Sequence, residues 1–508
     1  MFVRKKKNAS GSTSVQIIAK HKGKYKVIHS VGSSKDSEEI EYLYEKANQV
    51  IPDLLNQATL GFSFPEDETV RAFLANVNNL DIRTIGPERI FGRLFDRLGF
   101  NAVKDDLFRH ITIARLVYPT SKLKTIDYLY RYRGITVERN AIYRFLDTLN
   151  EQYKEKVERI AYEYTKKMLK TITAVFYDLT TLYFETEDED DLRKIGFSKD
   201  GKFQCPQIML GLLVGSGGFP IGYDIFEGNT FEGSTLIPTL AKIQRKYDLG
   251  KPVVVADAAL LSKKNLDSLS NQHYRFIIGA RIKNETDELK TQILKHAKDM
   301  KDGGSFVLKK PDGTRLVVTY SEKRARKDTH SREKGLKKLR AKVSSGKITK
   351  TQINNRGYNK FLTLSGEIDV SVDESKVEDD KPWDGLKGYI TNTRLPAKQI
   401  VGHYSHLWQI ERAFRISKTD LRVRPIYHYR KRRIEAHICI AFVAYAIYKE
   451  LERLLNKHKA GISPKRATEL TQNMYEIHYR LPQSRKEDTM MLGMSEEQEE
   501  VWRIVQKG

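Results

Sequence analysis

Three widely separated carboxylates, Asp178, Asp257 and Glu411, have the surroundings that a shared cation site requires. Asp178 ends the apolar run 174–178, and Asp257 ends the run 252–257, which has the same form. Runs of β-branched and aromatic residues are typical of buried strands. Because an unpaired ionised carboxylate is costly to bury, we expect each aspartate at the end of its strand, facing a cleft. Two such ends on neighbouring strands can share a divalent cation, which prefers hard oxygen ligands.

The third acid, Glu411, lies in a stretch from Ala397 to Arg422 that predicts one helix, since it lacks proline and contains a single glycine. At about 100° per residue, an apolar stripe predicts the face that packs on the core. Glu411 belongs to a second stripe of aromatic, apolar and basic residues beside it. The apolar stripe is Ile410, Ala413, Phe414 and Leu421, and the second is Tyr404, Leu407, Trp408, Glu411, Arg415 and Lys418.

The composition favours a polyanionic partner. Among 508 residues, Lys and Arg number 89 against 65 Asp and Glu, a net charge of +24, and such an excess makes binding to nucleic acid salt-dependent. Two cysteines, Cys205 and Cys439, are too few for a zinc site or a disulfide framework and fit a reducing cytoplasm. The sequence shows neither a signal region nor an apolar run of 18 residues, so we expect no membrane association.

The N-terminal third is expected to hold two small regions. Residues 1–60 predict a β-hairpin followed by a helix, and residues 61–170 predict a mainly helical DNA-binding region. Within it, residues 134–146 have the pattern of a turn and capped helix, as in a helix-turn-helix, although a plain helical hairpin explains them equally well. If the first interpretation holds, Arg139 and Arg144 contact DNA.

Around the acids, the sequence resembles a branch of bacterial insertion-sequence transposases of the DDE type. Tyr404, Glu411 and Lys418 fit the Y-x2-R-x3-E-x6-K signature of that branch, and the segments 177–185, 228–230, 256–258 and 424–428 resemble it too. Leu407 occupies the arginine position of the signature. The phosphate contact expected there is either supplied by Arg412 or Arg415 or absent.

The resemblance implies an α/β fold with an RNase H-like mixed sheet interrupted by a β-containing insertion. Predicted strands at 174–178, 206–214, 219–226, 252–257 and 274–279, with helices at 234–247 and 262–271, have the order that this sheet requires. We expect core residues 171–282 and 384–452, an insertion at 283–383, and a C-terminal helical tail at 453–508. Strands at 305–308 and 315–320 are expected within the insertion.

The same resemblance implies Mg²⁺-dependent cleavage and transfer of DNA strands. Two Mg²⁺ ions, for which Mn²⁺ can substitute, are held by Asp178 as the bridging ligand, with Asp257 and Glu411 each completing one shell. The partners are double-stranded DNA, as transposon ends and target, and a second copy of the chain in a homodimer. The location is the bacterial cytoplasm, at the nucleoid. Tyr404 and Lys418 are expected to grip the transposon end. The further DNA contacts are expected at Trp408, Arg415, Arg424 and His428.

Two other functions fit the same residues. A structure-selective nuclease on this fold would cut but not join strands, and a non-catalytic DNA-binding relative would lack a working metal site. The acidic cluster 185–191 favours a solvated loop, because like charges repel each other. The basic run 430–433 lies closer to the acids and favours a phosphate contact.

Overall fold

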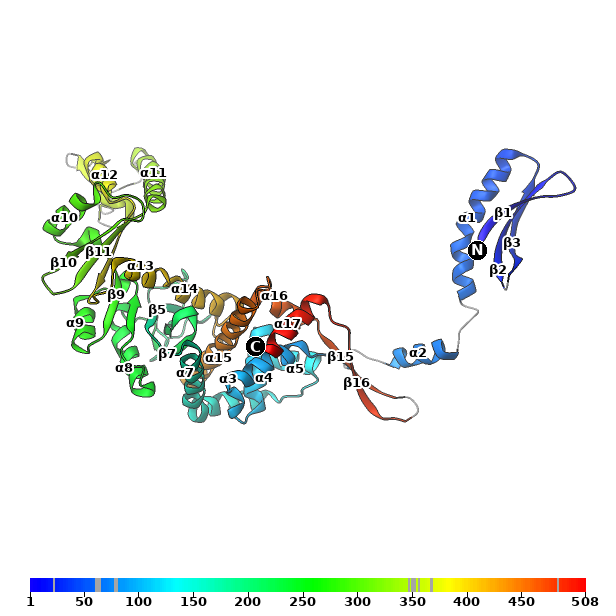
Figure 1. Ribbon diagram of the computed structural model, residues 1–508, viewed down its shortest axis with the longest axis horizontal. Helices are drawn as coiled ribbons and strands as arrows, with labels where there is room; N and C mark the ends of the chain where they lie inside the picture. The colour runs from blue at the N-terminus through cyan, green and yellow to red at the C-terminus, as the bar shows by residue number, and fades with distance from the viewer. Residues whose placement is uncertain are drawn as a thin grey trace. The chain divides into compact units, whose positions relative to one another are not determined.

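The computed structural model describes residues 1–21, 23–59, 65–76, 81–345, 348, 353–354, 357–365, 369–481 and 484–508. The chain divides into two units (Figure 1). The smaller consists of Met1–Ile82 and Ile477–Met490, and the larger consists of Arg83–Glu476 and Met491–Gly508. The domain boundary expected at residues 60–61 touches residues outside the described ones.

The smaller unit begins with a three-stranded antiparallel sheet covered by one helix. The expected hairpin is β2 and β3, and β1 adds a third strand along β2. Val15 and Ile17 of β2 are buried against Ala47 of the helix α1. The elements are β1 (Phe2–Lys7), β2 (Thr13–His21), β3 (Lys24–Ser34), α1 (Ser37–Thr59) and α2 (Pro65–Asn76).

Eight strands form the central sheet of the larger unit, in the order β10-β11-β14-β9-β8-β5-β6-β7. Strand β5 is antiparallel to β6 and parallel to β8, and β8 is parallel to β9. The segment β7-β6-β5-β8-β9 is therefore an RNase H-like mixed sheet, which confirms the predicted fold class. The strands are β5 (Ala174–Tyr183), β6 (Gln207–Val214), β7 (Pro220–Glu227), β8 (Val253–Ala256), β9 (Arg275–Ala280), β10 (Ser305–Lys309), β11 (Arg315–Tyr320) and β14 (Leu386–Thr391).

Strand β5 does not end at Asp178, and the expectation that it would was wrong. It pairs with β8 only as far as Tyr177 and Ala256, but its pairing with β6 continues to Tyr183. The antiparallel partner satisfies the backbone beyond Asp178, so the strand continues where β8 stops. Asp257, in contrast, directly follows β8 as predicted.

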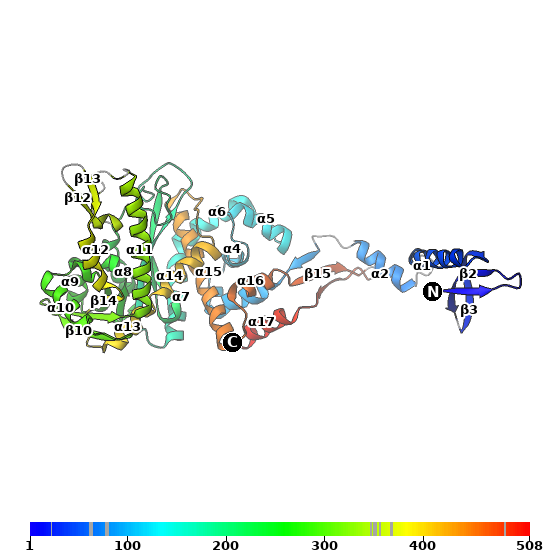
Figure 2. The same ribbon diagram turned by 90° about the horizontal axis from the view of Figure 1, so that it is seen from above.

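The insertion contributes strands to the central sheet. β10 and β11 occur where the sequence predicts them, and β11 pairs with β14, which in turn pairs with β9. In its described residues, the rest of the insertion holds three α-helices and a small hairpin, beside which Figure 2 shows the long helix α11. These elements are α10 (Asp287–Ala297), α11 (Glu322–Ser344), β12 (Leu362–Ser365), β13 (Asp369–Val372) and α12 (Glu374–Asp380).

Helices cover both faces of the sheet because the side chains along its strands alternate between two apolar cores. Phe176 and Val255 face the core that contains α15, whereas Tyr177 and Val254 face the core of α8. Helix α15 packs among α3, α4, α6 and α7. The helices are α3 (Arg93–Leu98), α4 (Asp106–Val117), α5 (Lys122–Arg133), α6 (Arg139–Thr148), α7 (Lys154–Leu169), α8 (Leu236–Tyr247), α9 (Lys263–Asn271) and α15 (Lys431–Lys457).

After α15, the chain is not purely helical. Helices α16 (Pro464–Thr471) and α17 (Glu496–Lys507) are separated by strands β15 (Tyr475–Arg480) and β16 (Glu487–Met491). The expected helical tail therefore also contains strands. In the β15–β16 segment, Arg480 donates to Glu487.

The single helix expected from Ala397 to Arg422 is broken. It forms α13 (Ala397–Ser405) and α14 (Trp408–Arg415), followed by a π-helical turn at Ile416–Asp420. The break contains neither proline nor glycine, and its backbone amides bond three residues back, as in a 3₁₀ turn. Its consequence is that Leu407 is buried while the adjacent Trp408 is half exposed. The predicted apolar stripe is confirmed, since Ile410, Ala413 and Phe414 of α14 and Leu421 after the π-helical turn are all buried.

Candidate active site

Asp178 and Asp257 lie side by side on neighbouring strands. Each directly follows one member of the last β5–β8 pair, Tyr177 and Ala256, and adjacent strands are about 4.8 Å apart. Alternation along the strands directs both aspartates to the face on which Phe176 and Val255 lie. Helix α14 contacts β5 on this face. The structure therefore brings together the two aspartates that the sequence singled out.

The charged form of Asp178 is disfavoured by its surroundings. Burial raises the pKa of Asp178 to about 6, and the negative charges of Asp257 and Glu232 act in the same direction. Lys199 opposes this shift; its ammonium donates to the Leu179 carbonyl at 2.8 Å and pairs with Glu232 at 2.9 Å. Sequence reasoning missed Lys199, which lies in a turn, and Glu232, which begins the short 3₁₀ helix Glu232–Ser234, because neither segment has a distinguishing pattern.

Asp257 is held by two hydrogen bonds to the same oxygen. Its Oδ1 accepts from the backbone N–H of Ala258 at 2.6 Å and from the Tyr404 hydroxyl at 3.1 Å. Tyr404 is only 6% exposed, and burial followed by the charge of Asp257 raises the pKa of its hydroxyl, which keeps it protonated as a donor. Both recorded bonds use Oδ1, so Oδ2 is the oxygen that remains for another ligand.

Glu411 approaches the same place from α14. Its negative charge, like that of Asp257, acts on Tyr404 and on Lys387, whose ammonium lies 4.4 Å from the centre of the Tyr404 ring. Burial, followed by the charge of Arg324, lowers the pKa of Lys387. Within the part of the chain that the structure describes, no three His, Cys, Asp or Glu side chains are close enough to hold a metal ion. Glu411 is thus a neighbour of the aspartates without completing a three-ligand site.

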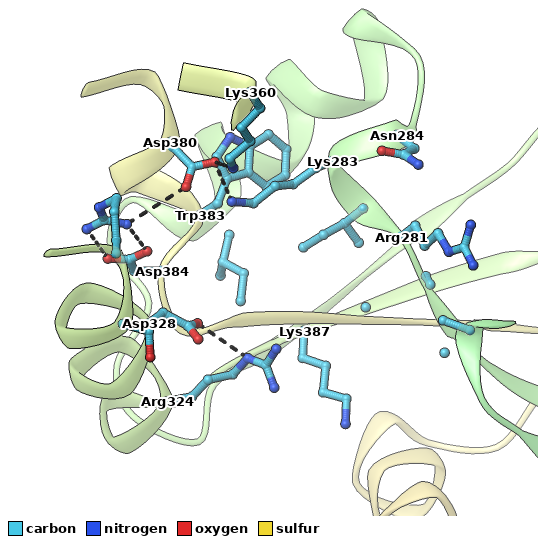
Figure 3. Close-up of a pocket in the computed structure, with 18 of the residues that line it drawn as sticks. Arg281, Lys283, Asn284, Arg324, Asp328, Lys360, Asp380, Trp383, Asp384 and Lys387 are labelled. Atoms are coloured by element: carbon cyan, nitrogen blue, oxygen red, sulfur yellow. Dashed lines mark hydrogen bonds and ion pairs between the residues drawn. The ribbon is translucent and has the colours of Figure 1, made fainter. Parts of the chain in front are cut away.

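A cavity of about 840 Å³ opens beside Asp257 and Tyr404 (Figure 3). Most cations in it are paired with insertion carboxylates, as Lys283 is with Asp380 at 2.6 Å. Arg281 and Lys387 have no recorded ion pair among the described residues, and Figure 3 draws none for them. Sequence reasoning missed both, although Lys387 alternates with Tyr389 along β14 and that pattern was a usable signal.

Comparison with known proteins identifies the family of this site. Residues 170–447 match the family model described as a transposase DDE domain. The chain belongs to the DDE transposase family. The chain is 27% identical over 165 residues to the transposase for insertion sequence element IS231E of Bacillus thuringiensis subsp. finitimus, a match covering 31% of this chain and 34% of that protein. The match to the IS231C transposase of B. thuringiensis subsp. berliner is 30% identical over 150 residues, covering 28% and 30%.

The aligned part spans about a third of the length of these relatives. Among solved structures, the piggyBac transposase synaptic complex with hairpin DNA is similar at 10% identity, covering 77% of this chain and 70% of that one, with a TM-score of 0.37. The Mos1 transposase paired-end complex with left transposon end matches at 13% identity over 36% and 57%, with a TM-score of 0.16. Among the described helices of the chain, none has the length and apolar character of a bilayer span.

The predicted DNA contacts on and after α14 differ in exposure. Trp408 is 50% exposed and Arg415 is also exposed, on the same helix as Glu411. Lys418 lies in the π-helical turn, where its ammonium pairs with Asp200 at 3.1 Å. Arg424 pairs with the same carboxylate at 3.0 Å. Asp200, which the sequence gave no reason to select, therefore holds two of the predicted DNA contacts.

Three predicted contacts remain, of which Arg139 and Arg144 lie in the helical region 61–170 and His428 precedes α15. Arg139 and Arg144 are exposed on α6, and Arg144 lies 3.6 Å from Glu138. His428 is buried, and burial lowers its pKa to about 3. Two members of the basic run that follows are paired, since Arg433 donates to both oxygens of Asp147 and Arg432 pairs with Asp147 and Glu151. Of the two arginines considered as substitutes at the Leu407 position, Arg412 pairs with Glu452, which leaves the exposed Arg415.

Proposed function

We propose that the protein is a transposase that binds the terminal inverted repeats of an insertion sequence and catalyses Mg²⁺-dependent cleavage and strand transfer. One observation carries the proposal. Asp178 and Asp257 are adjacent on parallel β5 and β8, within the residues that match the DDE domain, and Glu411 lies on the helix that crosses the same face.

The family implies a divalent metal, and the donor chemistry of this site fits one. Asp178, Asp257 and Glu411 offer only carboxylate oxygens, the ligands that Mg²⁺ prefers. The raised pKa of Asp178, caused by burial and by neighbouring carboxylates, is what a site lacking its counter-charge shows. Asp178 and Asp257 would hold the metal first, and Glu411 would have to move closer to share it. When bound, Mg²⁺ activates the attacking oxygen and stabilises the leaving one.

The chain's own groups position this chemistry. Tyr404 and the Ala258 N–H fix one oxygen of Asp257, so its second oxygen keeps a defined direction. Lys387 lies at the cavity beside the acids without a recorded ion pair among the described residues, and its ammonium can pair with a phosphate of the substrate. Lys199 limits the repulsion between Asp178 and its neighbours.

DNA would lie over α14 and the cavity of Figure 3. Trp408 is the exposed aromatic one helical turn before Glu411 and can stack on an unpaired base. Arg415 can hold the adjacent phosphate, and Arg139 and Arg144 can contact the duplex farther from the site. Tyr404 is now bonded to Asp257, and Lys418 is now paired with Asp200. Both are proposed to contact the transposon end when DNA binds. The proposed active form is a homodimer of this chain that joins two transposon ends.

The test incubates purified protein with labelled element ends, with and without Mg²⁺. Cleavage that requires Mg²⁺ and is lost in Asp178→Asn, Asp257→Asn and Glu411→Gln is expected, with DNA binding retained. Asp267→Asn, an exposed acid on α9, is the matched control and should cleave normally. Cleavage by all three site variants would refute the assignment.

A second assay separates the alternatives. Pre-cut ends with a free 3′-hydroxyl are supplied together with a target plasmid. Joined products support transposition, whereas cleavage without joining indicates a structure-selective nuclease. Specific end binding with neither reaction indicates a non-catalytic relative, the outcome that incomplete assembly of the three acids would produce.

A further inference from the structure

A second cavity, of about 590 Å³, lies among the helices of the larger unit, apart from the three acids. It is bounded by the end of α4, the start of α5, and the segment 422–428 beside α15. Five lysines and arginines and two histidines line it, and no carboxylate appears among the described residues of its lining. The seven are Arg115, Lys122, Lys124, Arg422, Arg424, His428 and His437.

Lys122 is the unusual member of this cavity. Its side chain is 5% exposed, and its ammonium has no hydrogen-bond partner among the described residues. The positive charge of Arg115 acts on it and lowers its pKa further than burial does alone. Arg115 is also buried and donates only weakly, at 3.3–3.4 Å, to the carbonyls of Leu421 and Arg422. Buried ammonium groups are almost always paired, so two close cations without a carboxylate indicate a missing anion.

One other donor in the cavity lacks a partner as well: the Nε of Arg424 is buried without a hydrogen bond among the described residues. His437 donates its Nε2–H to the carbonyl of Val423, at 2.9 Å, so in the neutral ring its Nδ1 is an acceptor and not a donor. The charge of one carboxylate, Asp147, acts to raise the pKa of His428. Asp147 is already bonded to Arg433. Asp200 engages the far side of the Arg424 guanidinium, at Nη1.

The start of α5 adds a backbone contribution. Ser121 caps this helix of 12 residues by accepting from the N–H of Lys124, and its carbonyl accepts from Thr125. The N–H groups of Lys122 and Leu123 precede these bonds, at the positive end of the helix dipole. A helix start beside buried cations is the arrangement that proteins use for phosphate.

We propose that this cavity is a phosphate site, formed by Lys122, Arg115, Arg424 and the start of α5, that takes one backbone phosphate of the bound DNA. The identity of the phosphate as DNA rests on the proposed function; the anion site itself does not. An anion there supplies the acceptors that the Lys122 Nζ and the Arg424 Nε lack, and it offsets the repulsion between Lys122 and Arg115.

The first experiment tests the anion site with inorganic phosphate and the full chain. Calorimetry should show binding that Lys122→Met reduces at least tenfold, while Lys457→Met leaves it unchanged. Lys457 is exposed at the opposite end of α15, about 30 Å from His437 at 1.5 Å per residue. Without phosphate, Lys122→Met should melt at a higher temperature than the wild type, because it removes an unpaired buried charge. A lower melting temperature together with unchanged phosphate binding would show a structural lysine and overturn the site.

The second experiment identifies the source of the phosphate. End DNA carrying a neutral methylphosphonate at single positions is titrated against both proteins. At one position the substitution should weaken wild-type binding about tenfold yet leave Lys122→Met binding unaffected, since the two changes remove the same contact. Additive losses at every position would overturn the DNA assignment and leave free phosphate as the ligand. Asp178→Asn separates the two proposals: it should abolish cleavage without changing either binding result.

Discussion

At the residue scale, Asp178 links the stability of the protein to pH. Its pKa in the folded protein is about 6, above the ordinary value of 3.8, so the folded state binds the proton more tightly than the unfolded state. Stability is therefore expected to fall as the pH rises from about 4 to 6 and to stay lowered above that. The shift corresponds to about 3 kcal/mol at most. Asp178→Asn should raise the melting temperature at pH 8 and change it little at pH 4.

Mg²⁺ supplies the control for this prediction. The ion should stabilise the wild type at pH 8, because it neutralises the carboxylates, and it should stabilise Asp178→Asn far less. A melting temperature of Asp178→Asn that is unchanged or lower at pH 8 would contradict the electrostatic origin of the raised pKa.

Tyr404 can act by positioning or by stacking, and two substitutions separate these roles. Its hydroxyl bonds Asp257 and its ring is buried against Tyr389 and Lys387. If positioning dominates, Tyr404→Phe should slow cleavage about five- to tenfold, the cost of roughly 1 kcal/mol for one hydrogen bond, without weakening end binding. Single-turnover cleavage and anisotropy measure the two quantities. If Tyr404 stacks on a base, Tyr404→Phe should remain fully active, and Tyr404→Ala alone should lose binding.

At the element scale, Leu407 lies at the break between α13 and α14, and its burial there limits which side chains position 407 can hold. The family signature places arginine there, but Leu407 is 6% exposed in the core shared with Ile410 and Phe414. Leu407→Arg should therefore lower the melting temperature, since it buries an unpaired charge at a cost of several kcal/mol. Arg415→Leu, on the exposed face, should leave the melting temperature unchanged and weaken end binding. Full stability of Leu407→Arg with tighter end binding would show that this helix face is exposed in solution.

The same elements show how far the sequence predicted the site. The apolar runs predicted β5 and β8 and hence the pairing of Asp178 with Asp257, because strand periodicity is a local signal. The continuation of β5 depends on β6, and the break at 406–407 has no proline or glycine to mark it. Ion pairs such as Lys418 with Asp200 join residues far apart in sequence. Such pairings are set by the tertiary fold, which local patterns do not encode.

At the scale of the whole molecule, the net charge of +24 predicts a steep salt dependence of DNA binding. Each phosphate contact contributes about one to the slope of log K against log salt. Arg139→Gln and Arg144→Gln, on the exposed face of α6, should each reduce that slope by about one if α6 lies on the duplex. Anisotropy over a salt series measures the slope. Unchanged slopes in both variants would favour the plain helical hairpin over a helix-turn-helix.

The insertion is predicted to be part of the folding unit of the core. β11 pairs with β14 from Arg315–Thr391 to Tyr320–Leu386, so the insertion supplies the hydrogen-bonding partner of a core strand. Leu316 and Val318 of β11 are fully buried in the core that also contains Val254. Deleting residues 287–384 should thus expose the edge of β14, lower the melting temperature sharply and favour aggregation. Hydrogen exchange of the intact protein should show β11 and β14 protected to the same degree as β5. A deletion variant that melts like the wild type would instead show an independent module, with a boundary where the sequence alone suggested one, at 283–383.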